Sequence, residues 1–266
     1  MTGRLDGKVA FITGAGSVGP GWGNGRATAI RFAQEGAKVF ATDIDLANLD
    51  ETLHLAGDAA KNITTAKLDI FQASAIEESI QACIQKYGAL NILVNVVGGS
   101  AKGGPVEMTE EVWDAQVDFN LKSVFLTCKY ALPQMVKQEK GSIINFASTS
   151  GTRWTGSAQI AYAATKAGVI QFSKVLAVQY AKQNIRVNTI VPGQLHTPMV
   201  ETRLAKQRVG GDVELLLKQR QSRIPLPFMG DGRDTANAAL FLASEESRFV
   251  TGSEIVVDGG MSARCD

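Results

Sequence analysis

The pair of side chains with the clearest chemistry in this sequence is Tyr162 and Lys166, in the segment AYAATKAG. Their spacing of four residues places both side chains on one face of a helix. A phenol titrates near pH 10 and is therefore a poor base at neutral pH. A neighbouring ammonium stabilises the phenolate, and such a charge can lower the pKa by roughly 1–3 units. The spacing thus predicts a tyrosine that exchanges a proton with a bound substrate, with Lys166 lowering its pKa.

The segment TGAGSVGPGWGNGR, residues 13–26, has the composition of a phosphate-binding turn. A literal G-x-G-x-x-G occupies residues 14–19, directly after an apolar run. That pattern should lead straight into a helix, but Pro20 follows it, and the helical pattern begins only near Asn24. We therefore interpret the literal match as fortuitous.

The binding turn is expected instead at Gly14, Gly23 and Gly25. A pyrophosphate needs backbone N–H groups at a helix N-terminus, and side chains there would block its approach. Gly14 would supply the tight turn after the first strand, while Gly23 and Gly25 would allow close approach and helix–strand packing. The residues between them make the loop longer than usual.

Asp43 ends the apolar run VFATD and follows Gly25 by 18 residues. This is near the spacing at which a carboxylate meets the adenosine ribose of a dinucleotide, with Asp45 as the alternative. Residues 40–50 contain no Lys or Arg that could accept the extra phosphate of NADP. The nearest cation, Arg26, is interpreted as an ordinary first-turn residue. The pattern predicts a preference for NAD(H) over NADP(H).

Elements that position these residues follow from the alternation of apolar runs and helical periods. Continuous Val/Ile strands between helices indicate a parallel sheet covered on both faces, a doubly wound α/β fold of the Rossmann-like type. We expect one dinucleotide-binding catalytic domain over residues 1–266. The expected strands, seven in number, are 8–14, 38–44, 63–70, 90–97, 141–148, 185–192 and 253–260.

Two further patterns indicate helices, and one segment breaks the alternation. Ile76, Ile80 and Cys83 fall on one helix face, and Thr109 before two glutamates is typical of a helix start. Residues 195–230 contain three prolines and interrupt the strand–helix pattern. Such an insertion near the end of a sheet predicts a substrate loop, or lid, over the site.

Composition limits the classes of function. The chain has 266 residues, 45% of them hydrophobic, and a formal net charge of +1, which gives no bulk attraction to nucleic acid or membrane. The three cysteines and two histidines form no cluster with ligand spacing, so no catalytic metal is expected. The first residues show no secretory signal, and we expect a cytoplasmic protein.

Together these motifs resemble those of the short-chain dehydrogenase/reductase family, and the resemblance extends over essentially the whole chain. The family carries a Thr-Gly-x3-Gly-x-Gly turn after its first strand. Thr13, Gly14, Gly23 and Gly25 match it with five residues inserted, and Asn24 lies within the turn. The resemblance implies that these residues contact the cofactor.

The resemblance also assigns roles around Tyr162. The family's active-site serine stands three residues before a glycine, which Ser148 matches, with Ser150 as the alternative. This hydroxyl would hydrogen-bond the substrate oxygen. Lys166 would hold the nicotinamide ribose, and Asn120 would hold a water that links the lysine to solvent. The implied catalytic residues are therefore Ser148, Tyr162, Lys166 and Asn120.

Further cofactor contacts are implied at the ends of other strands. The segment Asn95-Val96-Val97-Gly98 corresponds to Asn-Asn-Ala-Gly in the family, and its second asparagine is lost. A second segment, Asp69-Ile70, would flank the adenine. The residues implied in these contacts are Asn95, Gly98, Asp69, Ile70 and, from a Pro-Gly-x3-Thr match, Pro192, Gly193, Leu195 and Thr197.

The resemblance implies an NAD(H)-dependent oxidoreductase that interconverts a secondary alcohol and a ketone by hydride transfer. An enoyl reductase of the same fold usually shows Tyr-x6-Lys, which is not found after the fifth strand. A 3-oxoacyl-type ketoreductase is closer in pattern, although most of these use NADP. A catalytically silent dinucleotide sensor is the alternative from another class.

The sequence leaves the substrate open. Trp154 suggests an apolar or ring-bearing substrate, and Arg153 suggests an acid group on the substrate. His196 is interpreted as a loop residue rather than a catalyst. We also expect a homotetramer or a dimer, because the patterns at 109–138 and 160–182 are apolar over wide faces. The candidate residues for the substrate wall are Gly99, Ser100, Arg153, Trp154, Leu195, His196 and Met199.

Overall fold

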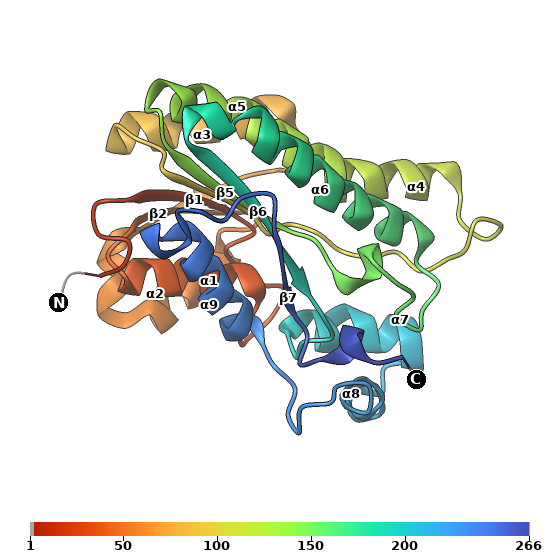
Figure 1. Ribbon diagram of the computed structural model, residues 1–266. Helices are drawn as coiled ribbons and strands as arrows, with labels where there is room; N and C mark the ends of the chain where they lie inside the picture. Colours follow the sequence, from red (N-terminus) through yellow and green to blue (C-terminus); the bar gives the residue numbers. More distant parts are fainter. Residues whose placement is uncertain (1–2, 266) are drawn as a thin grey trace.

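The protein is built on a seven-stranded parallel sheet, seen in a computed structural model that describes residues 3–265 (Figure 1). The strand order is β3-β2-β1-β4-β5-β6-β7, so the predicted doubly wound Rossmann-like sheet is confirmed. Each predicted strand forms, and most end one to three residues earlier than expected. The strands are β1 (Val9–Thr13), β2 (Lys38–Asp43), β3 (Ile63–Lys67), β4 (Ile92–Asn95), β5 (Gly141–Phe146), β6 (Ile185–Pro192) and β7 (Glu254–Val257).

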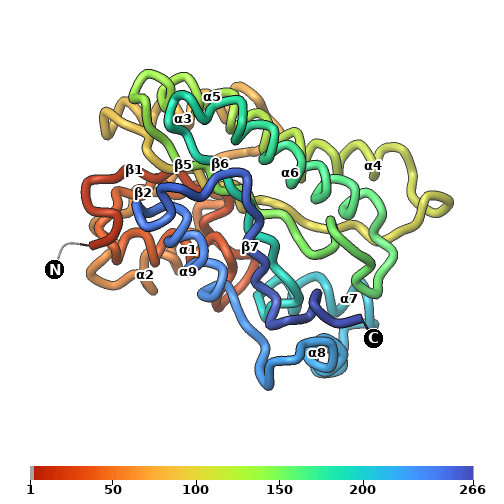
Figure 2. The backbone as a smooth tube through the Cα atoms, in the orientation of Figure 1, coloured from red at the N-terminus to blue at the C-terminus, as the bar shows by residue number. Residues whose placement is uncertain are grey.

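Helices cover both faces of the sheet, as the continuous apolar strands require. One layer holds α1 (Asn24–Gln34), α2 (Ala47–Ala56) and α9 (Gly232–Ala243). The opposite layer holds α3 (Ala73–Tyr87), α4 (Glu110–Val117), α5 (Ser123–Lys137) and α6 (Ile160–Gln179) (Figures 1 and 2). Each layer buries its own apolar cluster against the sheet.

The local signals for helices also hold. Ile76, Ile80 and Cys83 are fully buried on one face of α3, and Thr109 caps α4 by accepting a hydrogen bond from the Val112 N–H at 3.4 Å. The remaining short helical turns are η1 (Gly57–Asn62), η2 (Asp118–Lys122), η3 (Thr149–Gly151), η4 (Ala181–Gln183), η6 (Glu245–Ser247) and η7 (Met261–Ala263).

The central strands end at one edge of the sheet. Thr13 of β1 lies opposite Thr42 of β2 on one side and Asn95 of β4 on the other. Asn95 in turn lies opposite Asn145 of β5. Since the strand order reverses between β1 and β4, a crevice opens beyond these carboxyl ends, which is where such sheets bind ligands.

The segment predicted as a substrate loop, residues 195–230, is largely helical. It contains η5 (Val200–Leu204), α7 (Ala205–Val209) and α8 (Val213–Gln221). Val200, Ala205 and Leu216 form a small buried cluster of its own. Figure 1 shows these helices beside the C-terminal end of the chain, separate from the two main helix layers. Its residues therefore have fixed positions relative to one another.

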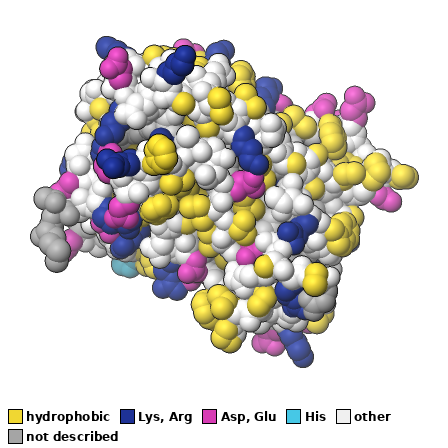
Figure 3. Space-filling model, in the orientation of Figure 1, with side chains coloured by type: hydrophobic (Ala, Val, Ile, Leu, Met, Phe, Trp, Pro, Cys, Tyr) yellow, Lys and Arg dark blue, Asp and Glu magenta, His cyan; other side chains and the backbone are white. Residues whose placement is uncertain are grey.

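The surface carries apolar side chains between its charged ones (Figure 3). Phe125 on α5 and Val175 and Val178 on α6 are exposed, and so is Phe249 near the C-terminal end. Within residues 3–265, no helix is long and apolar enough to cross a membrane. In the same part of the chain, no three His, Cys, Asp or Glu side chains are grouped as metal ligands would be.

Candidate active site

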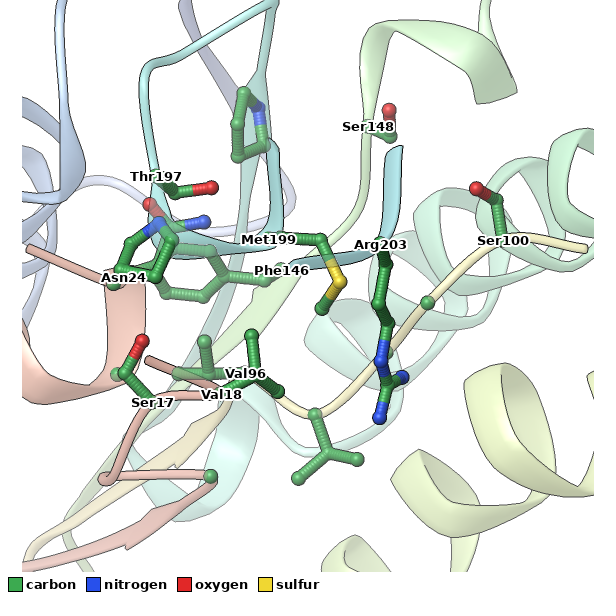
Figure 4. Close-up of a pocket in the computed structure, with 18 of the residues that line it drawn as sticks. Ser17, Val18, Asn24, Val96, Ser100, Phe146, Ser148, Thr197, Met199 and Arg203 are labelled. Atoms are coloured by element: carbon green, nitrogen blue, oxygen red, sulfur yellow. The ribbon is translucent and has the colours of Figure 1, made fainter. Parts of the chain in front are cut away.

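A cavity of about 780 Å³ lies beyond the carboxyl ends of β1, β2, β4, β5 and β6. Loops that follow these strands form most of its wall, and the 195–230 segment closes one side. Figure 4 shows residues from distant parts of the chain, such as Asn24, Val96, Ser148 and Thr197, around this cavity. The cavity therefore contains the region where the sequence predicted a ligand.

The glycine turn is built as the sequence predicts at its two ends. Gly14 has a φ of +64°, a conformation that favours glycine. A Cβ on Gly25 would lie 1.8 Å from the carbonyl oxygen of Gly14, so the first turn of α1 and the end of β1 touch. Gly23, Asn24 and Gly25 all line the cavity at the N-terminus of α1. This is an arrangement suited to a pyrophosphate.

The interpretation of the literal G-x-G-x-x-G as fortuitous is wrong in part. The Gly16 N–H donates a hydrogen bond to Oδ2 of Asp43 at 3.1 Å. A Cβ on Gly16 would lie 2.6 Å from the Asn48 Cβ, so only glycine fits there. Gly16, Ser17 and Val18 line the cavity, whereas Gly19 does not. The inserted residues thus extend the binding turn, which no spacing rule for a shorter turn could show.

Arg26 stabilises the inserted loop through hydrogen bonds to its backbone. It is therefore not the ordinary first-turn residue that the sequence predicted. Its side chain is only 1% exposed. The guanidinium donates to the carbonyl oxygens of Gly19 at 3.1 Å and Gly21 at 2.7 Å. It also pairs with Glu51 at 2.8 Å. Because Arg26 is not part of the cavity wall, its hydrogen bonds stabilise the loop rather than face a ligand.

Asp43 lies at the wall of the cavity with its carboxylate held in place. Besides the Gly16 N–H, it accepts hydrogen bonds from the Asn48 amide at 3.1 Å and the Asp45 N–H at 3.3 Å. Asp45 lines the cavity too. Two carboxylates therefore stand at this end, and neither Lys nor Arg is among the wall residues Ser17, Val18, Asp43, Ile44, Asp45 and Asn48.

At the other end of the cavity lie Tyr162 and Lys166, which the helix α6 brings to one face. The lysine Nζ is 5.8 Å from the centre of the tyrosine ring and donates to the Phe146 carbonyl oxygen at 2.9 Å. Burial lowers the pKa of Lys166 to about 8.

The expectation that Lys166 lowers the pKa of Tyr162 is not what the structure shows. Burial is the largest influence and raises the pKa of Tyr162 above its ordinary value. The groups that act in the opposite direction are a hydrogen bond with Ser148 and the charges of Arg208 and Arg220. The Lys166 ammonium instead donates a hydrogen bond to the Phe146 carbonyl oxygen.

Ser148, rather than the alternative Ser150, faces Tyr162. The Ser148 hydroxyl accepts the Ser150 N–H at 3.2 Å, and its interaction with Tyr162 acts to lower the pKa of the tyrosine. The Ser150 hydroxyl is engaged elsewhere, with Thr155 at 3.0 Å and Gln159 at 2.7 Å. Ser150 therefore belongs to the network that supports the wall.

Asn120 lies in η2, a single π-helical turn between α4 and α5, the kind of irregularity that often marks a functional position. Its side chain accepts the Gly99 N–H at 3.0 Å and donates to the Gly99 carbonyl at 3.1 Å. A Cβ on Gly98 would lie 2.9 Å from Oδ1 of Asn120 and 2.8 Å from Nζ of Lys166. Asn120, Gly98 and Lys166 thus come together.

Two residues expected to contact the cofactor do not line the cavity. Asn95 turns into the protein interior, where it donates to Asn145 at 2.9 Å and accepts from Thr127 at 2.8 Å. Asp69 caps the turn after β3 through the Phe71 N–H at 3.0 Å. These hydrogen bonds within the protein replace the expected contacts, and neighbours of both residues line the cavity instead: Leu68, Ile70, Phe71, Val96, Val97 and Gly98.

Other expected positions lie on the wall. Gly193 follows the last residue of β6, and a Cβ at this position would lie 2.4 Å from the Asp258 Cβ. Glycine is therefore required where the chain leaves β6. Thr13, at the end of β1, accepts the Val96 N–H at 3.1 Å. The cavity-lining residues among the sequence predictions also include Pro192, Gly193, Leu195 and Thr197, with Gly99, Ser100 and Met199 on the substrate wall.

Three residues predicted for the substrate wall lie outside the cavity. Trp154 is 74% exposed, Arg153 is exposed, and His196 pairs with Glu201 at 3.1 Å on the surface. Besides Lys166, the cationic side chains that line the cavity are Arg203, Arg208 and Arg220 (Figure 4 labels the first of these arginines). They come from η5, α7 and α8, whose packing no local sequence signal defines.

Comparisons with known proteins agree with this architecture. A family model described as enoyl-(acyl carrier protein) reductase matches residues 20–262. The 3-oxoacyl-[acyl-carrier-protein] reductase of Thermotoga maritima is 42% identical over 97% of this chain and 99% of its own length. A short-chain dehydrogenase/reductase of Burkholderia xenovorans has a TM-score of 0.95 at 59% identity, covering 99% of this chain and 100% of that one.

A third match carries a bound cofactor. The carveol dehydrogenase of Mycobacterium avium, solved in complex with NAD, has a TM-score of 0.90 at 33% identity, covering 99% of this chain and 100% of that one. The chain belongs to the short-chain dehydrogenase/reductase family. It is an oxidoreductase of the type that interconverts an alcohol and a ketone with a nicotinamide dinucleotide.

Proposed function

We propose that this protein is an NAD(H)-dependent dehydrogenase acting on a secondary alcohol or the corresponding ketone, with Tyr162 as the acid/base. The observation that carries the proposal is one continuous cavity. One end of it has a glycine turn at a helix N-terminus and a fixed carboxylate, Asp43. The other end has Tyr162 in contact with Ser148 and near a buried Lys166.

The residues present fit a nicotinamide dinucleotide. Gly14, Gly16 and Gly25 keep side chains away from the N-terminus of α1, where Cβ atoms would collide with neighbouring atoms. Backbone N–H groups there would hold the pyrophosphate. Asp43 would accept hydrogen bonds from the adenosine ribose, and Thr197 would face the nicotinamide. When bound, this cofactor accepts or supplies the hydride.

The protein itself handles the proton. In alcohol oxidation, Tyr162 would take the hydroxyl proton while the Ser148 hydroxyl orients the same oxygen. Because burial disfavours the phenolate, nearby positive charge is needed to bring the tyrosine into a useful range. Lys166 would contact the nicotinamide ribose, and Asn120, beside Gly98, would link the lysine to solvent.

The test for Tyr162 is its replacement by phenylalanine, which removes one oxygen. We expect the Tyr162→Phe variant to keep its fold and cofactor binding and to lose roughly 10²–10⁴-fold in turnover of secondary alcohols. The matched control is Tyr180→Phe, because Tyr180 lies at the end of α6 and away from the cavity wall. Loss in both variants, or in neither, contradicts the assignment. Wild-type protein that binds NADH but turns over no alcohol or ketone would support the silent sensor.

Preference for NAD over NADP is proposed from the charges around Asp43. The 2′-phosphate of NADP would come close to a carboxylate that three hydrogen bonds hold in place. At an effective dielectric near 20, two unit charges about 4 Å apart repel by roughly 4 kcal/mol before screening. Even a third of that corresponds to about tenfold in affinity. Arg26 cannot easily offset it, since its guanidinium is already bound by Gly21 and Glu51.

Steady-state kinetics with both cofactors tests this preference. We expect Asp43→Ala to bind NAD more weakly and NADP more tightly than the wild type does. The ratio of kcat/KM with NAD to kcat/KM with NADP should then fall by about tenfold or more. The matched control is Asp45→Ala, which removes a carboxylate from the same wall but not the one bound to Gly16. Wild-type protein with a higher kcat/KM for NADPH would contradict the assignment of Asp43.

A second candidate activity is reduction of a 3-oxoacyl thioester, favoured by the 42% identity to the Thermotoga maritima reductase. The same tyrosine, serine and lysine would serve it. Assays with a 3-oxoacyl thioester and with small ketones, each with NADH and NADPH, separate the two candidates. Preferential turnover of the thioester with NADPH would favour the second.

A further inference from the structure

Two arginines line the cavity at the end where Tyr162 lies. Arg220 of α8 is only 6% exposed. Its Nη2 donates to the Leu195 carbonyl oxygen at 3.0 Å, but its buried Nε has no partner among the described residues. Arg208 of α7 donates through Nη2 to the Gln159 side-chain oxygen at 3.0 Å. Both guanidinium groups therefore keep donors that no residue between 3 and 265 uses.

Among residues 3–265, no ion pair involves Arg208 or Arg220. The carboxylates on the cavity wall, Asp43 and Asp45, stand in the glycine-turn region at its other end. Burial, with the positive charges of Arg208 and Arg223, lowers the pKa of Arg220 to about 10. Buried charges are normally paired, so this end of the cavity is suited to an anionic group of a ligand.

The position of this positive charge identifies the ligand that would supply the anion. Arg208 binds Gln159, the residue at the start of α6, three positions before Tyr162 on the same cavity wall. Both arginines also act electrostatically on Tyr162, in keeping with a place at the reacting end of the cavity. The pyrophosphate region lies around the N-terminus of α1, whose wall residues include Gly14, Gly23 and Gly25. An anionic group near the arginines would thus belong to the substrate rather than to the cofactor.

We propose that the substrate is a hydroxy acid, or the corresponding keto acid, whose carboxylate binds Arg208 and Arg220 while its carbinol or carbonyl carbon faces Tyr162. This proposal rests on the function proposed above. The planar fork of arginine matches a carboxylate, with two parallel N–H donors. Arg203, from η5, also lines the cavity, but its guanidinium points away from Ser148 (Figure 4) and is not part of the proposed carboxylate site. The sequence suggested that Arg153 binds an acid group of the substrate. In this proposal Arg208 of α7 and Arg220 of α8 bind it instead.

The experiment compares keto acids with their methyl esters, which keep the carbonyl and remove the charge. A series with one to four carbons between carbonyl and carboxylate is assayed with NADH, and binding of each compound to the NADH-saturated protein is measured by calorimetry. We expect at least one acid to bind and react about tenfold or more better than its ester, the range of a charge-assisted hydrogen bond. Calorimetry gives a result even for compounds that are not reduced.

Variants connect the preference to the two arginines. Arg208→Gln and Arg220→Gln should each lower the ratio of acid to ester kcat/KM about tenfold, through KM of the acid. Arg220→Lys, which keeps the charge, should restore part of the ratio. Arg153→Gln is the matched control, since Arg153 is exposed and outside the cavity wall. An arginine that only supports the Leu195 loop would affect acids and esters equally and leave the ratio unchanged.

The outcomes separate the two proposals. Esters or neutral ketones that bind and react as well as every acid would overturn the hydroxy-acid proposal and leave the dehydrogenase intact. A normal acid-to-ester ratio in both glutamine variants would overturn the assignment to Arg208 and Arg220. Acids that bind tightly to protein that reduces no compound would instead count against the proposed dehydrogenase activity.

Discussion

Replacing Arg26 by methionine should show how much the inserted glycine loop depends on one buried side chain. Methionine keeps most of the volume and removes every hydrogen bond. The variant loses the ion pair to Glu51 at 2.8 Å and the bonds to the carbonyl oxygens of Gly19, Gly21 and Asn48 at 3.1, 2.7 and 3.2 Å.

The expected loss of stability follows from burial. Removing one partner of a buried ion pair costs roughly 3–5 kcal/mol. Since the Glu51 side chain is 35% exposed, it can regain hydration, and we take the lower half of that range, about 3–4 kcal/mol. For a chain of this size 1 kcal/mol shifts Tm by about 2–4 °C. Tm should therefore fall by about 6–16 °C.

Calorimetric melting with and without NAD measures this effect. The matched control is Arg31→Met, on the same helix, because Arg31 pairs with Glu35 at 2.9 Å at a partly exposed position, worth about 0–1 kcal/mol. The Arg26→Met variant should also bind NAD and NADP more weakly than the wild type does, by the same factor for both cofactors. A Tm change like that of the control would refute the structural reasoning. A selective loss of NADP binding would show that Arg26 contacts the phosphate.

The remaining predictions concern pH and assembly. Because burial lowers the folded-state pKa of Lys166 to about 8, the unfolded chain binds more protons between pH 8 and the ordinary lysine value, so stability should rise with pH there. In urea unfolding, the free energy of unfolding of the wild type should rise by up to about 2 kcal/mol more than that of Lys166→Met between pH 8 and about 9.5. An equal dependence on pH in the two proteins would contradict the lowered pKa of Lys166. In light scattering at micromolar concentration we expect a homotetramer or dimer, and Val178→Asp, at a position 79% exposed on α6, should reduce the mass. A monomeric wild type would reject this.

The fold could be predicted because its signals are local. Continuous apolar runs define the strands, and the helical periods between them define a parallel sheet. Even the start of α1 at Asn24 follows from the glycines before it. The ends of the strands were less well predicted, since the last residues of an apolar run can bend away from the sheet to line a cavity, as Val96 and Val97 do.

Residues of the cavity wall could be predicted where the backbone fixes their position, and less well where a side chain has several possible hydrogen-bond partners. Gly25 and Gly193 are fixed by contacts closer than a Cβ allows. Asn95 stands at the expected strand end, yet its amide is taken by Asn145 and Thr127. Asp69 similarly turns to the Phe71 N–H. A sequence motif locates such residues but does not show which hydrogen bonds compete for them.

The arginines of the 195–230 segment were missed for a related reason. Their inward direction depends on how α7 and α8 pack through Val200, Ala205 and Leu216, and a short amphipathic helix gives no signal for this. Charge then differs between the two ends of one cavity, with carboxylates beside the glycine turn and arginines beside Tyr162. A ligand with an uncharged ribose at the first end and an anion at the second would complement both. The two arginines that would hold a substrate carboxylate also lower the pKa of Tyr162 in the ligand-free protein. A carboxylate bound to them would offset part of this effect, so substrate binding and proton transfer depend on the same side chains.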